Sequence, residues 1–131
     1  MGKVRVLLAD DHETLLERVR SILGKDFEVV GTVANGRDAV TEVRRLDPDV
    51  LVMDISMPIL NGLRAASQLH RRSCRTKIVF LTVHEDQDYV DAALAAGASG
   101  YVTKAHVTSD LVPAIREALL AHTYISKSIK P

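Results

Sequence analysis

Five residues with charged or reactive side chains lie at the ends of apolar runs, where strands of a sheet would end. Asp10 and Asp11 follow the first run, and Asp54 follows a second. Thr82 and Lys104 lie at the ends of two further runs. The carboxyl ends of parallel strands meet at one edge of an open sheet, which is where ligands bind. If these runs are neighbouring strands, the five side chains converge on one pocket.

Three carboxylates in one pocket repel one another, and burial disfavours their charged forms. A hard divalent cation removes this conflict, and an all-oxygen site suits Mg²⁺ or Mn²⁺. The Lys104 ammonium and the Thr82 hydroxyl add a positive charge and a hydrogen-bond donor on the opposite side. Together these groups predict a cradle for an anion, most simply a phosphoryl group. One carboxylate is then a candidate nucleophile that forms an aspartyl phosphate.

Each of these residues also has an ordinary structural interpretation. An aspartate such as Asp11 at a strand end often caps the following helix, and a lone lysine such as Lys104 is usually solvated. It is the joint placement at four strand ends that favours a functional site.

The elements that must position these residues alternate between strand and helix patterns. Short apolar, β-branched runs predict five strands, at residues 4–9, 27–33, 50–53, 78–81 and 99–102. Apolar residues at helical spacing predict five helices, at residues 15–23, 35–46, 61–69, 85–96 and 111–119. Pro113 is expected in the first turn of the last helix, where its missing N–H costs little. This alternation predicts an α/β fold with a parallel sheet covered on both faces.

The composition excludes several classes of protein. The 131 residues suffice for one domain, and 47% of them are hydrophobic, so the chain can bury a core. The formal net charge is zero, which argues against a free-standing nucleic-acid binder. The single cysteine, Cys74, excludes an internal disulfide and a multi-cysteine metal site. No apolar run approaches the roughly 20 residues that span a bilayer, so we expect a cytoplasmic protein with no membrane partner.

The chain resembles the receiver domains of bacterial two-component response regulators from about Lys3 to His122. The matching segments are LLADD (7–11), VLVMDISMPILNG (50–62), FLTVH (80–84) and GASGYVTK (97–104). With the TYIS segment at 123–126, the last of these is most similar to the LuxR-type (NarL/FixJ-like) transcription regulators. The resemblance implies a single doubly wound, flavodoxin-like sheet with strand order 2-1-3-4-5 and five helices. It also implies a receiver domain over residues 1–122, with the start of a linker or C-terminal tail over residues 123–131.

The resemblance assigns the acidic residues to phosphoryl transfer and metal binding. Asp54 would accept a phosphoryl group from a sensor histidine kinase. Asp11 would ligate Mg²⁺ or Mn²⁺ directly, together with Asp54, and Asp10 would contribute partly through water. The backbone carbonyl of Ser56 would complete the protein ligands.

The resemblance also implies a conformational switch. Lys104 would pair with one phosphoryl oxygen, and Thr82 would move to bind another. Tyr101 would then swing inward into the space that Thr82 leaves. Such a chain is not an enzyme in the usual sense, because it catalyses only its own phosphorylation and slow dephosphorylation.

Three residues in or near these motifs need separate interpretation. Val83 stands where the family often has alanine, and its bulk predicts slow reaction with small phosphodonors. Ala105 stands where many receivers have a proline in a cis bond, so a cis bond is not expected here. His84 follows Thr82 by two positions and is interpreted as a surface histidine, with an influence on attacking water as the alternative.

The output has two open interpretations. The chain could be part of a transcription regulator that forms a homodimer on phosphorylation and contacts DNA only through a C-terminal helix-turn-helix domain absent from this chain. It could instead be a stand-alone receiver that acts by protein–protein interaction. Two other classes are disfavoured: a flavin or nucleotide binder lacks its glycine-rich loop here, and a haloacid-dehalogenase-type phosphatase needs an aspartate where Ser56 stands.

Overall fold

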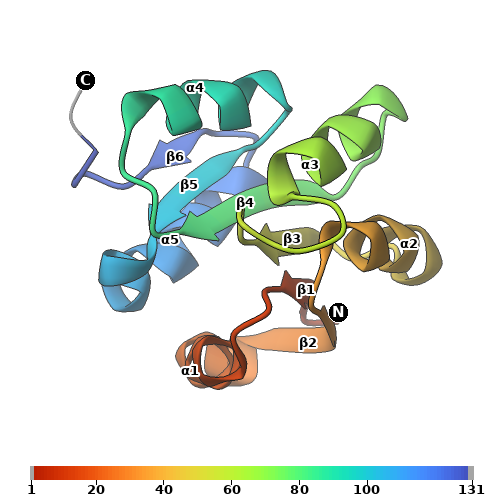
Figure 1. Cartoon of the computed structure of the whole chain (residues 1–131). Coiled ribbons are helices and arrows are strands. Elements are labelled where there is room, and N and C mark those ends of the chain that lie inside the picture. Colours follow the sequence, from red (N-terminus) through yellow and green to blue (C-terminus); the bar gives the residue numbers. More distant parts are fainter. Residues whose placement is uncertain (1, 130–131) are drawn as a thin grey trace.

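A computed structural model describes residues 2–129 as a parallel sheet with helices on both faces (Figure 1). The strands are β1 (Val4–Ala9), β2 (Phe27–Val33), β3 (Val50–Met53), β4 (Lys77–Thr82), β5 (Gly100–Thr103) and β6 (Tyr124–Ile125). Their order across the sheet is β2-β1-β3-β4-β5-β6, and every neighbouring pair is parallel. The predicted α/β class and the order 2-1-3-4-5 are therefore confirmed, with a sixth strand added.

Strand β6 lies in the segment that the sequence predicts as the start of a linker or tail. Tyr124 pairs with Gly100, and Ile125 pairs with Tyr101 on β5. A strand of two residues is too short to show the alternation of apolar and polar residues that marks a strand. The prediction of five strands therefore missed it.

The helices divide between the two faces of the sheet (Figure 1). They are α1 (Glu13–Leu23), α2 (Gly36–Leu46), α3 (Gly62–Arg71), α4 (Gln87–Ala95) and α5 (Val107–Leu119), with short 3₁₀ turns η1 (Gly24–Asp26) and η2 (Lys104–His106). Helices α1 and α5 share one buried apolar cluster, and α2, α3 and α4 share the other. No helix among residues 2–129 is long and apolar enough to cross a membrane.

The placement of Pro113 in the first turn of the last helix was wrong. Helix α5 begins at Val107, and Pro113 lies inside it. Val107 is fully buried, as is Leu111 four residues later, so the apolar face of the helix starts one turn earlier than predicted. The interior proline lacks the N–H that would bond to the carbonyl four residues back.

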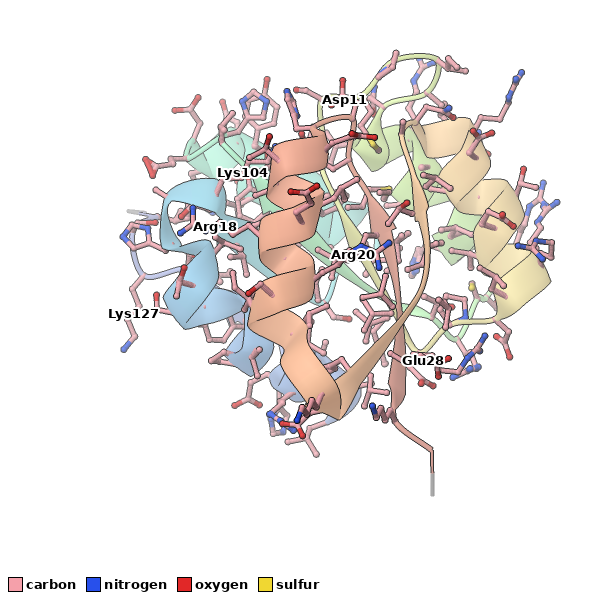
Figure 2. The ribbon with its side chains drawn as sticks, turned by 90° about the horizontal axis from the view of Figure 1, so that it is seen from below. Asp11, Arg18, Arg20, Glu28, Lys104 and Lys127 are labelled. Atoms are coloured by element: carbon pink, nitrogen blue, oxygen red, sulfur yellow. The ribbon has the colours of Figure 1, made fainter. Side chains whose placement is uncertain are left out.

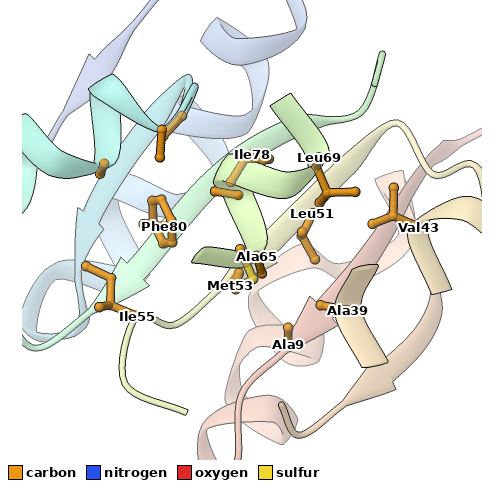
Figure 3. Close-up of a cluster of buried hydrophobic side chains, with 14 of the residues drawn as sticks. Ala9, Ala39, Val43, Leu51, Met53, Ile55, Ala65, Leu69, Ile78 and Phe80 are labelled. Atoms are coloured by element: carbon orange, nitrogen blue, oxygen red, sulfur yellow. The ribbon is translucent and has the colours of Figure 1, made fainter. Parts of the chain in front are cut away.

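The centre of the sheet is buried on both sides, which fixes the strands that carry the site. Every residue of β3 is buried, because helices cover both of its faces. Leu51 and Met53 on β3 pack with Phe80 on β4 and with Ala65 and Leu69 on α3 (Figure 3).

Helix α3 approaches the end of β3 so closely that only glycine fits at its first residue. A Cβ atom on Gly62 would lie 2.1 Å from the carbonyl oxygen of Asp54. The Gly62 N–H donates to the carbonyl of Ile55 at 2.8 Å, and the Asn61 side chain caps the helix by accepting from the Arg64 N–H. This contact fixes the backbone at Asp54.

A second set of polar contacts joins the loops at the amino ends of the strands. The Arg5 N–H donates to Asp49 Oδ2 at 2.8 Å, and Arg75 Nη1 donates to Asp49 Oδ1 at 3.1 Å. Arg75 Nε also donates to Asp47 Oδ1 at 3.0 Å. Asp49 is thus held by two arginines from distant parts of the chain.

Candidate functional site

Asp10 and Asp54 lie side by side at the carboxyl ends of β1 and β3. The two strands are paired, and the Asp54 N–H donates to the carbonyl of Ala9 at 3.0 Å. Both aspartates are buried, with 4% and 3% of their surface exposed. Asp54 Oδ1 accepts a hydrogen bond from the N–H of Ile55 at 2.7 Å, which fixes the orientation of the carboxylate. The predicted convergence of these strand ends is present.

Lys104 reaches both carboxylates from the end of β5. Its Nζ lies 3.0 Å from Asp54 Oδ2 and 3.0 Å from Asp10 Oδ2. Burial alone would lower the pKa of Lys104, but its interactions with the Asp54 and Asp10 carboxylates outweigh burial, so the pKa lies above its ordinary value. The lysine therefore stays charged and holds two buried carboxylates together.

Asp11 and His12 complete an acidic group at the start of α1. One ligand atom from each of Asp10, Asp11, His12 and Asp54 lies within 4.8 Å of the others. Asp11 is exposed, and Figure 2 shows it at the same end of the molecule as Lys104. His12 Nδ1 lies 2.8 Å from Asp10 Oδ1 and 3.1 Å from Asp11 Oδ1. No metal-ligand spacing marks His12 in the sequence, and its position next to Asp10 and Asp11 was the available signal.

The donor atoms of this group fit a hard divalent cation. Asp10 Oδ2 is buried and accepts no well-aligned hydrogen bond from the described residues, although the Lys104 ammonium lies beside it as an ion pair. Three carboxylates facing one exposed opening carry more negative charge than a single lysine balances. Mg²⁺ and Mn²⁺ prefer such oxygen ligands.

Thr82 at the end of β4 and Tyr101 on β5 are both fully buried. Thr82 Oγ1 accepts a long hydrogen bond of 3.4 Å from the N–H of His84. The Tyr101 hydroxyl donates to the carbonyl of His84 at 2.7 Å. Burial, followed by the nearby Tyr89 and Asp86, raises the pKa of Tyr101 well above its usual range. The tyrosine side chain is thus buried and bonded to the loop that follows β4.

His84 lies at the surface, as interpreted from the sequence, but it has specific side-chain contacts there. Its ring is partly buried and stacks on Tyr89, with ring centroids 4.0 Å apart and planes inclined by 10°. His84 Nε2 lies 2.9 Å from Ser56 Oγ, which joins the loops after β3 and β4. These contacts depend on how two loops meet, and no spacing along the sequence shows that.

A cleft of about 380 Å³ opens beside Lys104. It is lined by His12, Thr14, Leu15, Arg18, Val83 and Lys104. Val83 is 65% exposed and forms part of the wall of this cleft. Lys104 is the first residue of η2, and none of the described peptide bonds, including that to Ala105, is cis.

A family model for the response regulator receiver domain matches residues 6–116. The chain belongs to the response regulator receiver domain family. Its curated relatives include the transcriptional regulatory protein DegU of Brevibacillus brevis, 36% identical over 130 residues, and the response regulator UvrY of Escherichia coli K12, 38% identical over 128 residues. These alignments cover 98% and 96% of the chain but 55% and 59% of the relatives, so the receiver spans little more than half of their length.

Solved structures show the same fold. A LuxR-family two-component response regulator from Aurantimonas sp. SI85-9A1 has a TM-score of 0.91 and 31% identity, and the match covers 98% of this chain and 93% of that one. The isolated REC domain of RcsB from Salmonella enterica serovar Typhimurium, in the presence of the phosphomimetic BeF₃⁻, has a TM-score of 0.87 and 25% identity. That match covers 98% of this receiver and 96% of the RcsB domain. The resemblance to LuxR-type receivers is confirmed, whereas the roles of single site residues stay predictions.

Proposed function

We propose that this receiver accepts a phosphoryl group on Asp54 from a sensor histidine kinase and switches conformation as a result. The observation that carries the proposal is the buried Asp54 carboxylate, which faces Asp10 and lies 3.0 Å from the Lys104 ammonium. Such a carboxylate is oriented by its neighbours and placed among groups that stabilise the transferred charge.

The transfer is a displacement at phosphorus. A carboxylate oxygen of Asp54 attacks the phosphorus of a phosphohistidine, and a P–O bond forms while the P–N bond breaks. The leaving imidazole nitrogen takes a proton from solvent. Lys104 shifts from the carboxylates to a phosphoryl oxygen, and the Thr82 hydroxyl donates to another. Asp10, Asp11, Asp54 and the carbonyl of Ser56 would hold Mg²⁺ or Mn²⁺, which neutralises negative charge on the carboxylates and the phosphoryl group.

The signal ends when water attacks the phosphorus and the P–O bond to Asp54 breaks, releasing inorganic phosphate. The chain would therefore catalyse only its own phosphorylation and its slow dephosphorylation. Ser56 follows β3 and His84 follows β4, and Ser56 Oγ lies 2.9 Å from His84 Nε2. Their side chains are the candidates to influence the attacking water.

The output that the relatives favour is control of transcription, and we place it in the cytoplasm as part of the same proposal. DegU is named a transcriptional regulatory protein, and a solved structure shows RcsB dimers bound to DNA. We propose by analogy that phosphorylation promotes a homodimer and that DNA is contacted through a helix-turn-helix domain outside these residues. A stand-alone receiver that binds a protein target is the alternative.

Phosphotransfer profiling against the purified histidine kinases of the source organism tests the proposal. We expect at least one phosphorylated kinase to label this chain in the presence of Mg²⁺, and we expect EDTA to prevent the labelling. If none of the kinases labels the chain with Mg²⁺ present, the proposed function is wrong.

A further inference from the structure

The segment Tyr124–Ile129, here called the C-terminal strap, lies along the free edge of β5. Its first residues pair with β5, and the Tyr124 N–H donates to the carbonyl of Ser99 at 3.1 Å. Its last residue, Ile129, packs against the apolar cluster that contains Tyr101. The strap therefore contacts β5, the strand that contains Tyr101 and that ends directly before Lys104.

Ser126 makes the closest connection between the strap and β5. Its N–H donates to the carbonyl of Tyr101 at 2.9 Å, and its hydroxyl oxygen accepts from the N–H of Thr103 at 3.2 Å. The same hydroxyl donates to Asp110 Oδ2 on α5 at 2.7 Å. Ser126 is 1% exposed, so both of these hydroxyl bonds are made in a buried place, where an unmade bond is costly.

Thr103 connects Ser126 to the phosphoacceptor site. It precedes Lys104, whose ammonium contacts Asp54 and Asp10, and it lies opposite Thr82 in the pairing of β4 with β5. Its hydroxyl is held by His106 Nδ1 and Ser128 Oγ, both at 3.1 Å. A change in the backbone at Thr103 must therefore move the base of the Lys104 side chain.

We propose that Ser126 is a positioning residue for phosphoryl transfer and that the C-terminal strap is coupled to the phosphoacceptor site through it. By bonding to the backbone on both sides of Val102, Ser126 fixes the end of β5 and so holds Lys104 where it meets Asp54. This inference rests on the proposed function.

The coupling must act in both directions, because coupling free energies are reciprocal. If the docked strap favours the position of Lys104 that binds a phosphoryl group, then a phosphoryl group on Asp54 favours the docked strap. The strap is the element best able to report this change, because it is short and lies at the sheet edge, and such segments open at low cost. The phosphorylation state of Asp54 thereby changes how firmly the C-terminal strap is docked on β5.

The first test measures the rate at which Asp54 is phosphorylated by phosphoramidate and Mg²⁺, using intact-mass spectrometry. We expect Ser126→Ala to lower the maximal rate about three- to tenfold and to leave the half-saturating phosphoramidate concentration nearly unchanged, because Lys104 acts on the transferring group. Lys127→Ala is the matched control, because Lys127 is exposed in the same strap and points into solvent (Figure 2). It should react at the wild-type rate.

The second test measures hydrogen exchange at the amides of Ser126 and Ile129 in the same samples. Phosphorylation of the wild-type chain should slow this exchange about tenfold, and Ser126→Ala should remove the effect. A wild-type rate for Ser126→Ala, or wild-type strap exchange that is unchanged or faster after phosphorylation, overturns the inference. If Ser126→Ala does not fold, the wild-type exchange decides alone. If neither phosphoramidate nor a phosphorylated histidine kinase phosphorylates the wild-type chain, the proposed function fails instead.

Discussion

Lys104 Nζ lies at the same distance, 3.0 Å, from Asp10 Oδ2 and from Asp54 Oδ2. The three residues come from the ends of three different strands. One ammonium thus compensates two buried carboxylates, which makes Lys104 important for stability as well as for phosphoryl transfer.

Replacing Lys104 should weaken the fold when no divalent cation is present. Lys104→Ala leaves Asp10 and Asp54 buried without a counter-charge, and removal of one partner from a buried ion pair costs about 3 kcal/mol. Mg²⁺ affinity should hold or increase, because the competing ammonium is gone. Denaturant unfolding with and without Mg²⁺ measures both effects, with Lys127→Ala as an exposed control. A Lys104→Ala chain as stable as wild type in EDTA would contradict the described pairing.

Mg²⁺ should stabilise the wild-type chain and should do so through Asp11. Free metal at roughly ten times its Kd adds about 1.4 kcal/mol to the free energy of unfolding. Asp11→Ala relieves repulsion but deletes a direct ligand, so it should be at least as stable as wild type in EDTA and lose most of the Mg²⁺-dependent gain. Thermal melts of both proteins at several Mg²⁺ concentrations check this. Equal gains in both would show that Asp11 does not bind the metal.

Gly62→Ala should destabilise the fold and disturb Asp54. The added methyl group would lie 2.1 Å from the carbonyl oxygen of Asp54, so helix α3 or the end of β3 must shift. Such overpacking costs about 2 kcal/mol. Gly2→Ala is the control, because nothing lies within 4 Å of its Cβ position. Urea unfolding compares the two variants, and similar midpoints would mean that α3 does not press on the Asp54 backbone.

Asp49 should give the stability a dependence on acidic pH. Its bond from the Arg5 N–H, followed by Arg75, holds its pKa below the ordinary value of 3.8. A lowered pKa stabilises the fold above the unfolded-state pKa, and this contribution is lost as the pH falls through the folded-state pKa. Asp49→Asn should therefore be less stable than wild type by about 1 kcal/mol at pH 7 and nearly equal to it at pH 2.

Asp47→Asn is the matched control for this experiment. Asp47 contacts the same Arg75, but its side chain is 67% exposed and its φ is 47°, a conformation that asparagine tolerates. Urea unfolding between pH 2 and pH 7 should show little change for this variant. A constant difference between wild type and Asp49→Asn over that range would contradict the assigned interaction.

The sheet and the core of the site could be predicted because their signals lie in the sequence itself. The apolar runs end at Asp10, Asp54 and Thr82. Parallel strands bring such ends to one edge of the sheet, and this does not depend on the conformation of the loops. The contact of Lys104 with both carboxylates follows from the same geometry.

The features that were missed depend on contacts between loops or on single polar atoms. The bond of His84 with Ser56 needs two loops to meet. Strand β6 has two residues and is anchored by the hydroxyl of Ser126, which leaves no periodic pattern. The start of α5 was placed late because Pro113 resembles a first-turn proline, whereas buried Val107 marks the true beginning.

The most direct test of the proposed phosphoacceptor is intact-mass spectrometry after incubation with a competent histidine kinase, ATP and Mg²⁺. Wild type should gain one phosphoryl group, and Asp54→Asn should gain none, because Asp54 is the proposed nucleophile, at the end of β3 and beside Lys104. Asp11→Asn serves as the comparison, since it removes a neighbouring carboxylate but keeps the nucleophile, and it should be labelled more slowly. Full labelling of Asp54→Asn would contradict the account.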